Sequence, residues 1–203
     1  FPNKDEWKLM GDVGLLQRIG QQFHWKNEGY ATFDDFLAQL SSRKRKAIRK
    51  ERRAVTEHGI RIRHLVGNDI TESHWDAFYG FYLNTSDRKW GPTYLNREFF
   101  SLLHQNMGSN VLLIMAESEG SPVGAALNLI GGDTLFGRYW GCSEHFKFLH
   151  FETCYYQAID FAIARRLAWV EAGAQGPHKI QRGYLPTPTY SAHWIADASV
   201  GVM

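Results

Sequence analysis

The sequence predicts an α+β fold, in which a mixed, mainly antiparallel, twisted sheet is flanked by helices. Three strand-like segments, 111–117, 122–130 and 134–141, follow one another with short Gly-containing turns between them, as antiparallel neighbours do. Segments with helical spacing of apolar residues precede and follow this group. With 203 residues, the chain is long enough for one domain with a substantial core.

The first 58 residues are expected to hold three helices and one strand. Thr32 is a favourable N-cap, Ser41 or Ser42 can start the long basic segment, and Gly59 suits its C-terminal cap. The expected elements are a helix over 4–20, a strand over 21–26, a short helix over 32–40 and a helix over 41–58.

The rest of the chain alternates between the two periodicities. Segment 111–117 is apolar on both faces, so we expect it to be a central strand, and Arg165 and Arg166 suit the negative end of the helix before them. Besides the three strands already given, the expected elements are a strand over 60–65, a helix from Thr71, a helix over 95–103, a helix over 150–167, a strand over 168–172 and a last strand over 189–195.

Composition places the chain among globular proteins. No apolar run approaches the roughly 18 residues that a membrane-spanning helix needs, so no transmembrane segment is expected. Cys142 and Cys154 are too few for a disulfide framework and lack metal-ligand spacing, which predicts a reducing compartment and no bound metal. The chain starts at Phe1 without a signal pattern. We therefore expect a cytoplasmic protein, and a chain that is a fragment of a longer one.

Positive charge is concentrated between residues 43 and 53. These eleven residues contain eight lysines and arginines and one carboxylate, whereas the net charge of the whole chain is +2. Two interpretations stay open: a solvated helix face, or a seat for a polyanion such as RNA phosphates, a pyrophosphate or an anionic lipid surface. No aromatic side chains are interleaved, so base stacking is not expected. The candidate polyanion contacts are Arg43, Arg45, Lys46 and Arg49.

Segment 171–194 has the composition of a functional site. It contains three glycines, two histidines, a Glu, a Lys and an Arg, and most of it is too rich in Gly and Pro to be a helix. Glycine allows close approach of the backbone, and histidine titrates near neutral pH. The chemistry that such groups perform includes proton transfer and the binding of anions.

Each polar residue of this segment has a functional and a structural interpretation. Glu171 and His178 are alternative proton acceptors, and each is equally well a salt-bridging carboxylate or a hydrogen-bonded loop histidine. Tyr184 either donates to a developing oxyanion or packs in the core. The candidate substrate contacts are Gln175, Lys179 and Arg182, which are alternatively loop-capping or solvated side chains.

A second group of candidates precedes this segment. Because side chains of a strand alternate between its two faces, Arg138 shares a face with Trp140. Gly137 and Gly141 are on the other face, which therefore lacks side chains at these positions. A charged side chain on such a face needs a partner, either Glu152 or Glu144 nearby or an anionic substrate. Arg138, Trp140 and Glu152 are therefore expected substrate-binding residues, with an internal ion pair as the alternative.

Four motifs carry a resemblance to a known family. They are Ser-Ser-Arg-Lys-Arg-Lys-Ala-Ile-Arg-Lys-Glu-Arg-Arg at 41–53, Phe-Gly-Arg-Tyr-Trp-Gly-Cys at 136–142, His-Phe-Glu-Thr-Cys-Tyr-Tyr-Gln at 150–157 and the segment 171–194. Together they resemble the FemAB-like N-acyltransferases of peptidoglycan biosynthesis or recognition. The order of elements is also similar to that of the GCN5-related acetyltransferase (GNAT) fold. More distantly, the basic helix with Gly59 is similar to a pattern in the Fem aminoacyltransferases, which have two tandem GNAT-like domains.

The resemblance implies transfer of an acyl or aminoacyl group to an amine. The acceptor would be a small-molecule or lipid-linked amine such as a peptidoglycan precursor, the donor acyl-CoA or aminoacyl-tRNA, and contact with a membrane surface is compatible with it. It also implies that residues 1–58 are the tail of a preceding GNAT-like half with its basic linking helix, and that 59–203 form the GNAT-like acyltransferase domain. Because segment 143–150 lacks the glycines that hold a CoA pyrophosphate, ordinary CoA binding in this half is not expected.

Two further alternatives concern the same residues. A noncatalytic module would recognise a cell-wall precursor or RNA through the basic helix and the 171–184 loop, with steep salt dependence. The aromatic side chains before the central strands either pack in the core or line a groove for a muropeptide or sugar; they are Trp75, Tyr79, Tyr82, Trp90 and Tyr94.

Overall fold

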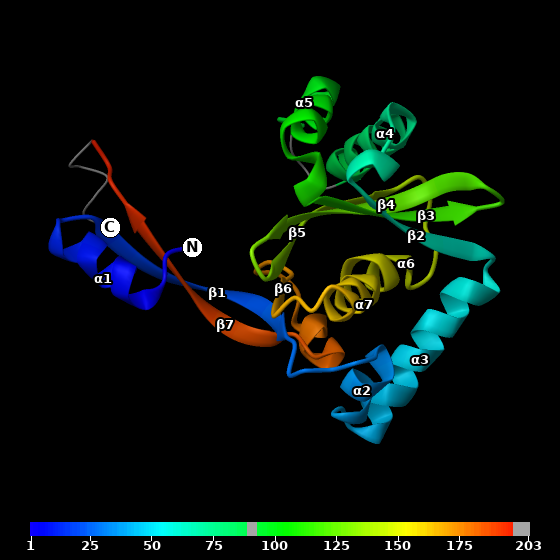
Figure 1. Ribbon diagram of the computed structural model, residues 1–203, viewed down its shortest axis with the longest axis horizontal. Helices are drawn as coiled ribbons and strands as arrows, with labels where there is room; N and C mark the ends of the chain where they lie inside the picture. Colours follow the sequence, from blue (N-terminus) through cyan, green and yellow to red (C-terminus); the bar gives the residue numbers. More distant parts are fainter. Residues whose placement is uncertain (89–92, 197–203) are drawn as a thin grey trace.

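The computed structural model describes residues 1–88 and 93–196, and Figure 1 shows their arrangement. The strands are β1 (Leu16–Lys26), β2 (Ile60–Val66), β3 (Val111–Ser118), β4 (Ser121–Gly131), β5 (Thr134–Cys142), β6 (Trp169–Glu171) and β7 (Leu185–His193). The α-helices are α1 (Lys4–Asp12), α2 (Phe33–Ala38), α3 (Ser42–Glu57), α4 (Glu72–Arg88), α5 (Arg97–Met107), α6 (Leu149–Phe151) and α7 (Gln157–Ala164). Short helical turns are η1 (Gly67–Asp69), η2 (Gly108–Asn110), η3 (Glu152–Tyr156) and η4 (Pro177–Arg182).

The strands form a seven-stranded sheet in the order β2-β3-β4-β5-β6-β1-β7. All neighbours are antiparallel except β5 and β6, which are parallel and pair over three residues, from Thr134 opposite Trp169 to Phe136 opposite Glu171. The predicted α+β fold, with its mixed and mainly antiparallel sheet, is confirmed. Residues 111–117 are buried along their whole length, as predicted for a central strand.

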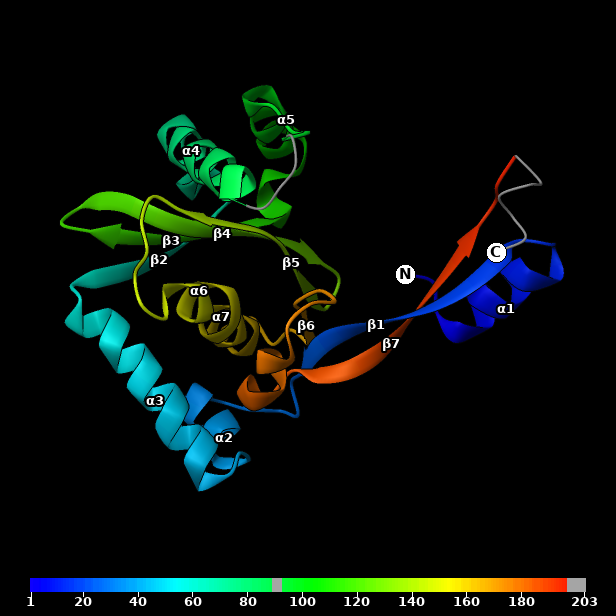
Figure 2. The ribbon, with the colours of Figure 1, turned by 180° about the vertical axis from the view of Figure 1, so that it is seen from behind.

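Helices cover both faces of the sheet. Figures 1 and 2 show α4 and α5 on one face, and α6 and α7 on the other, with α2 and α3 beyond them. Trp75, Phe78 and Phe100 form the core under α4 and α5. Leu112, Ile159 and Val170 belong to the core on the opposite face. At this end of the molecule, the sheet is therefore buried on both sides, and its strands are held in fixed positions.

At the other end, β1 and β7 leave the body as a two-stranded ribbon, against which α1 lies (Figure 1). The prediction of one helix over 4–20 is wrong in its second half. Helix α1 ends at Asp12, Gly14 adopts a φ of +90°, and the chain continues as β1 from Leu16. Pairing of β1 with β7, which is distant in the sequence, outweighs the local helical pattern.

Local capping signals agree with most other predicted boundaries. Thr32 forms a capping box with Asp35 at the start of α2, and Gly59, with a φ of +73°, follows the end of α3. Since β1 pairs with β6 as well as β7, the first 58 residues contribute a strand to the common sheet. Their origin as the tail of a preceding half stays a prediction.

Among the described residues, no helix is both long and apolar enough to cross a bilayer.

Two irregularities shape the region beside the β5–β6 pair. In β5, Tyr139 lies opposite Leu127 and Gly137 opposite Asn128, so Arg138 is an extra residue in a β-bulge. The predicted face that Arg138 shares with Trp140 assumed regular alternation, which the bulge breaks. The predicted helix over 150–167 is present as α6, η3 and α7, but η3 has π-helical hydrogen bonding. Such π segments re-aim side chains and are frequent at functional sites.

Candidate functional site

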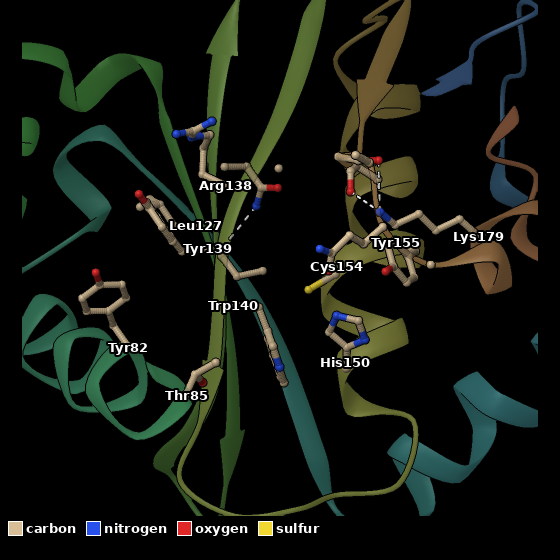
Figure 3. A pocket seen from close by; sticks show the side chains of 18 of the residues that line it. Tyr82, Thr85, Leu127, Arg138, Tyr139, Trp140, His150, Cys154, Tyr155 and Lys179 are labelled. Atoms are coloured by element: carbon tan, nitrogen blue, oxygen red, sulfur yellow. Dashed lines mark hydrogen bonds between the residues drawn. The ribbon is translucent and has the colours of Figure 1, made fainter. Parts of the chain in front are cut away.

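A cavity of about 750 Å³ opens where β5 and β6 separate. Residues 137–140 of β5 line one wall, and residues 172–176, which follow β6, line the other. Figure 3 shows Arg138 and Trp140 on the strand side, across from His150, Cys154 and Tyr155 on the helix. We call this cavity the strand-gap pocket.

The structure brings five of the predicted site residues together in the strand-gap pocket. Three are on its loop side and two on β5; they are Gln175, His178, Lys179, Arg138 and Trp140. The residues that follow Glu171 thus do enter one cavity beside Arg138. Four other predicted site residues are not among those that line it, namely Glu171, Tyr184, Glu152 and Arg182.

Arg138 is exposed and its charge is available to a ligand. Among the side chains that the structure describes, those of residues 1–85 and 93–196, it has no carboxylate within 4.0 Å, and its guanidinium lies 5.7 Å from the Tyr139 ring centroid. Neither Glu152 nor Glu144 is its partner in this part of the chain. An exposed guanidinium at the mouth of a cavity can bind a phosphate or carboxylate in two-pronged fashion.

His178 is the titratable group best placed for proton transfer. Its Nε2 lies 3.1 Å from Tyr155 Oη, and its ring packs 5.4 Å from that of Phe151. Burial, followed by the positive charges of Arg182 and Lys179, holds the pKa of His178 below its ordinary value of 6.5. Burial also raises the pKa of Tyr155, so its hydroxyl stays protonated. At neutral pH, His178 is therefore an uncharged imidazole with an acceptor nitrogen.

Gly176 leaves the space that the His178 ring occupies. A Cβ added at Gly176 would lie 2.3 Å from Cε1 of His178, and the φ of Gly176 is +101°. Gly173 also has a positive φ, +78°, but a Cβ there would meet nothing within 4 Å. The two glycines thus share a backbone requirement, and of the pair Gly176 is the one that makes room for His178.

We expect Gly176→Ala to displace the His178 ring from its place beside Tyr155, because the added Cβ and the ring cannot occupy the same space. Gly173→Ala is the control, since it carries the backbone strain without the clash. The His178 ring resonances in NMR spectra report the displacement. Equal ring shifts in the two variants would contradict a steric role for Gly176.

The loop between β6 and η4 lines the pocket with residues 172–176. In the described part of the chain, the N–H groups of residues 173–176 have no protein acceptor. Lys179 fixes this loop: its ammonium donates to the carbonyls of Ala172 and Gly173, the latter at 3.2 Å, as Figure 3 shows. Lys179 is 4% exposed, and burial lowers its pKa. Its contacts make it a positioning residue more than a ligand contact.

Glu171 is not among the residues that line the strand-gap pocket. Its carboxylate lies 3.8 Å from Nε2 of His24 on the neighbouring β1, opposite it in register. Burial lowers the pKa of His24, and the Glu171 carboxylate opposes that shift. Of the two proton acceptors that the sequence offered, His178 is thus the one with a ligand-accessible position.

Glu152 has internal partners in place of Arg138. It is 4% exposed, and Oε1 accepts from Arg52, with Nη2 at 3.1 Å, and from Gln157 at 2.7 Å. Arg52 also pairs with Asp160 at 2.6 Å and stacks over Phe33. Burial raises the pKa of Glu152, and Arg52 opposes this shift. The position of Glu152 is that of a structural ion pair joining α3 to η3.

Arg182 and Tyr184 are also built into the protein. Arg182 is 5% exposed, donates to both carboxylate oxygens of Glu51 at 2.8 Å, and stacks 3.6 Å from the Phe151 ring centroid. It also donates to the carbonyl of His178 at 2.9 Å, which fixes that residue's backbone. Tyr184 is fully buried, and its hydroxyl donates to the Tyr155 carbonyl. Of the two interpretations of Tyr184, the structure places it in the core.

The candidate polyanion contacts differ in how much charge they leave free. Arg45 donates to the carbonyls of Ala38 and Leu40, at the C-terminal end of α2, and Arg49 pairs with Asp34 at 2.7 Å. Arg43 and Lys46 are exposed and form no ion pair among the described residues. Two of the four candidate polyanion contacts therefore bind to the α2 region of the protein itself, and two remain exposed.

Three residues that line the pocket were not among the predicted site residues. His150, Cys154 and Tyr155 line the helix side. The spacing of 150 and 154 is that of one helix face, which is a weak signal for any buried helix. On the strand side, the hydroxyls of Tyr94 and Tyr139 are hydrogen bonded to each other, and burial together with this bond raises the pKa of Tyr139 to about 12.

The aromatic side chains before the central strands have both of the anticipated positions. Trp75 is fully buried in the core, Tyr94 is exposed and lines the strand-gap pocket, and Tyr82 lines the pocket while being 5% exposed and part of the core under α4 and α5. Trp90 lies outside the described residues.

Solved structures of other proteins have a fold similar to that of this chain. Among solved structures, L-PGS from Bacillus licheniformis has a TM-score of 0.68 at 10% identity, over 94% of this chain and 65% of that one. The crystal structure of FemX also has a TM-score of 0.68 at 10% identity, over 91% of this chain and 66% of that one. The chain thus spans about two thirds of each neighbour, and at these identities the likeness is one of fold. No curated protein has a matching sequence.

A family model settles the relationship that the motifs suggested. The model for FemAB-like proteins, described as peptidoglycan biosynthesis/recognition, matches residues 1–202, which is nearly the whole chain. The chain therefore belongs to the FemAB-like family.

Proposed function

We propose that the protein transfers an aminoacyl group from an aminoacyl ester to an amine, in the strand-gap pocket. The observation that carries this proposal is that neutral His178, hydrogen bonded to Tyr155, lines one cavity with residues 173–176, whose backbone N–H groups have no acceptor among the residues that the structure describes. Acyl transfer needs a base, an oxyanion donor and a surface for each substrate. Membership of a peptidoglycan biosynthesis/recognition family supports a cell-wall precursor as the acceptor.

The reaction uses His178 as the proton acceptor. The acceptor amine attacks the ester carbonyl, a C–N bond forms, the ester C–O bond breaks, and a proton moves from the nitrogen to the leaving oxygen through His178. If Nε2 carries the resting proton and donates to Tyr155 Oη, Nδ1 is the free base; in the other tautomer, Nε2 accepts from Tyr155, and the phenol relays the proton. Both routes require neutral His178.

The remaining pocket groups bind and orient. The N–H groups of residues 173–176 are suited to stabilise the developing oxyanion, since preorganised backbone donors do so without reorganisation. Arg138 is suited to an anionic group of a substrate, and Trp140 with Tyr82 and Tyr94 to a sugar or base ring. The two walls thereby take the two substrates.

The segment before α6 favours an aminoacyl ester over a CoA thioester as the donor. A pyrophosphate is held by consecutive backbone N–H groups at a glycine-rich helix start. Here Phe148, a bulky residue with a φ of +66°, precedes α6, and its neighbour Leu149 already donates its N–H to the Phe146 carbonyl. This segment is therefore poorly suited to cradle a diphosphate.

A transfer assay tests the proposal. The chain is incubated with a pool of tRNA charged with radiolabelled amino acids, and in parallel with acetyl-CoA, together with a muropeptide that bears a free lysine amine. We expect label on the amine from charged tRNA only, detected by mass spectrometry of the peptide. Retention of tRNA and muropeptide without any product would favour the noncatalytic binding module instead.

The pH profile of kcat/KM tests the role of His178 separately. Because the pKa of His178 is lowered, the imidazole is protonated, and inactive as a base, only below its ordinary value of 6.5. We therefore expect transfer to be independent of this group at pH 7 and above, and to decline as pH falls below 6.5. A decline centred above pH 7 would contradict the assignment.

A further inference from the structure

A second cavity, of about 330 Å³, lies between α3 and η4. Arg43 and Lys44 of α3 and Gln181 and Arg182 of η4 are among its lining residues, and none of the four lines the strand-gap pocket. We call it the α3–η4 cavity. Helix η4 contributes to both cavities, because its residues His178 and Lys179 line the strand-gap pocket.

The charge in the α3–η4 cavity is positive and uncompensated. Glu51 is an acid in its lining, but its carboxylate accepts from Arg182 at 2.8 Å through both oxygens and from the Tyr156 hydroxyl. Arg43 and Lys44 form no ion pair within the described ranges. The charge of Glu51 is thus matched by Arg182, and the two α3 cations remain for a ligand.

The start of α3 adds to this positive potential. Ser41, the N-cap residue, also lines the cavity, makes no side-chain capping bond, and precedes a first turn without an acidic residue. The first N–H groups of a helix lack intrahelical acceptors and form the positive end of its dipole. Basic side chains near this end are repelled by the positive end of the dipole. A bound anion is attracted both by the dipole and by these side chains.

A buried donor supplies an independent indication. Arg182 is 5% exposed and lines the cavity, yet its Nε–H has no acceptor among the side chains of residues 1–85 and 93–196 or the described backbone. A buried donor without an acceptor loses its hydrogen bonds to water and gains none in the protein, which is unfavourable. A negatively charged ligand beside this guanidinium lowers that cost electrostatically.

We infer that the α3–η4 cavity binds a phosphoryl group. A phosphate has three or more acceptor oxygens and up to two negative charges, which match two unpaired cations together with a helix start better than one carboxylate does. The phosphate comes either from a small diphosphate or from an RNA backbone, and the chemistry of recognition is the same. The site goes beyond the proposed transfer step, because no residue assigned to that step lines it.

Isothermal titration calorimetry of the full chain tests this inference with two probes, inorganic pyrophosphate and a short single-stranded RNA. The variant is Arg43→Ala/Lys44→Ala, and the matched control is Arg53→Ala, an exposed arginine further along α3 that has no ion pair among the described residues. We expect at least one probe to bind, with an affinity lowered about tenfold or more in the double variant and less than twofold in the control. Removing two phosphate contacts also reduces the salt dependence of RNA binding.

The two probes and the variants distinguish a small-diphosphate site, an RNA-backbone site and nonspecific attraction. Binding of pyrophosphate identifies a small-diphosphate site, and binding of RNA alone identifies a backbone site. Binding of neither probe, or an equal loss in the Arg53 control, overturns the inference, since the latter shows only diffuse attraction to a basic helix. His178→Ala is titrated in parallel: it leaves this binding unchanged, so failure of the transfer proposal and failure of this one are distinguishable.

Discussion

His178→Ala lowers the rate of aminoacyl transfer by about 10²–10⁴-fold, the usual contribution of a positioned general base. The loss falls on kcat, because the substrates still find Arg138, Trp140 and the backbone donors of the pocket. His178 is only partly buried, so its removal leaves the protein folded. The measurement is a steady-state transfer assay with charged tRNA, alongside thermal unfolding of the same samples.

Two companion variants sharpen this result. His58→Ala removes an exposed histidine at the end of α3 and is expected to keep full activity. Tyr155→Phe removes the phenol that hydrogen bonds His178. A loss close to that of His178→Ala indicates proton relay through the phenol, and a loss of about tenfold or less indicates that Tyr155 only orients the ring. Unchanged turnover in His178→Ala would remove this residue from the mechanism.

Arg52→Leu lowers the free energy of unfolding by about 3 kcal/mol, because it leaves the buried Glu152 carboxylate without a cation. The value is at the low end for a broken buried pair, since Gln157 still donates to Glu152. Arg53→Ala on the same helix, which is exposed, is expected to change stability by less than about 0.5 kcal/mol. Urea unfolding at pH 7 provides the comparison.

The effect of Arg52→Leu depends on pH in a defined direction. Burial raises the pKa of Glu152 above its ordinary value of 4.5, so folding favours the protonated acid, and stability from this group falls as pH rises through the raised pKa. Without Arg52 this tendency is stronger, and acid relieves it. The destabilisation is therefore smaller at pH 5 than at pH 7, and adding Glu152→Gln restores at least half of it. An equal loss at both pH values would indicate that packing over Phe33, and not charge, is what Arg52 supplies.

The sequence was most informative where local signals and tertiary packing agree. The turns around Gly120 and Gly132 and the uninterrupted apolar run at 111–116 specify the β3–β4–β5 meander, and the structure confirms it. The helix over 4–20 failed because β1 is stabilised by β7, some 170 residues away, and no short-range pattern reports such a partner. The π-helical turn η3 was equally unreadable, because its residues have ordinary helical spacing.

The site was predictable as a segment but not residue by residue. Composition located the 171–184 segment, of which three expected residues line the pocket, and the period-two pattern of β5 contributed Arg138 and Trp140. The direction of Glu171 depends on strand parity and on His24 of β1, and that of Arg138 on a bulge with no sequence signature. The partners of Glu152 and Arg182 are Arg52 and Glu51 of the basic helix, about 100 to 131 residues earlier in the chain. The charged residues between 43 and 53 thus form internal ion pairs as well as exposed surface.

The central claim is that transfer takes place between the two walls of the strand-gap pocket. The most direct test is a crystal structure of the protein with a stable amide analogue of an aminoacyl adenosine. The account predicts the amide carbonyl oxygen at about 3 Å from N–H groups of residues 173–176, with His178 beside the reacting nitrogen and the adenosine against Trp140 or Tyr82. An analogue ordered elsewhere on the molecule, with the strand-gap pocket empty, would contradict it.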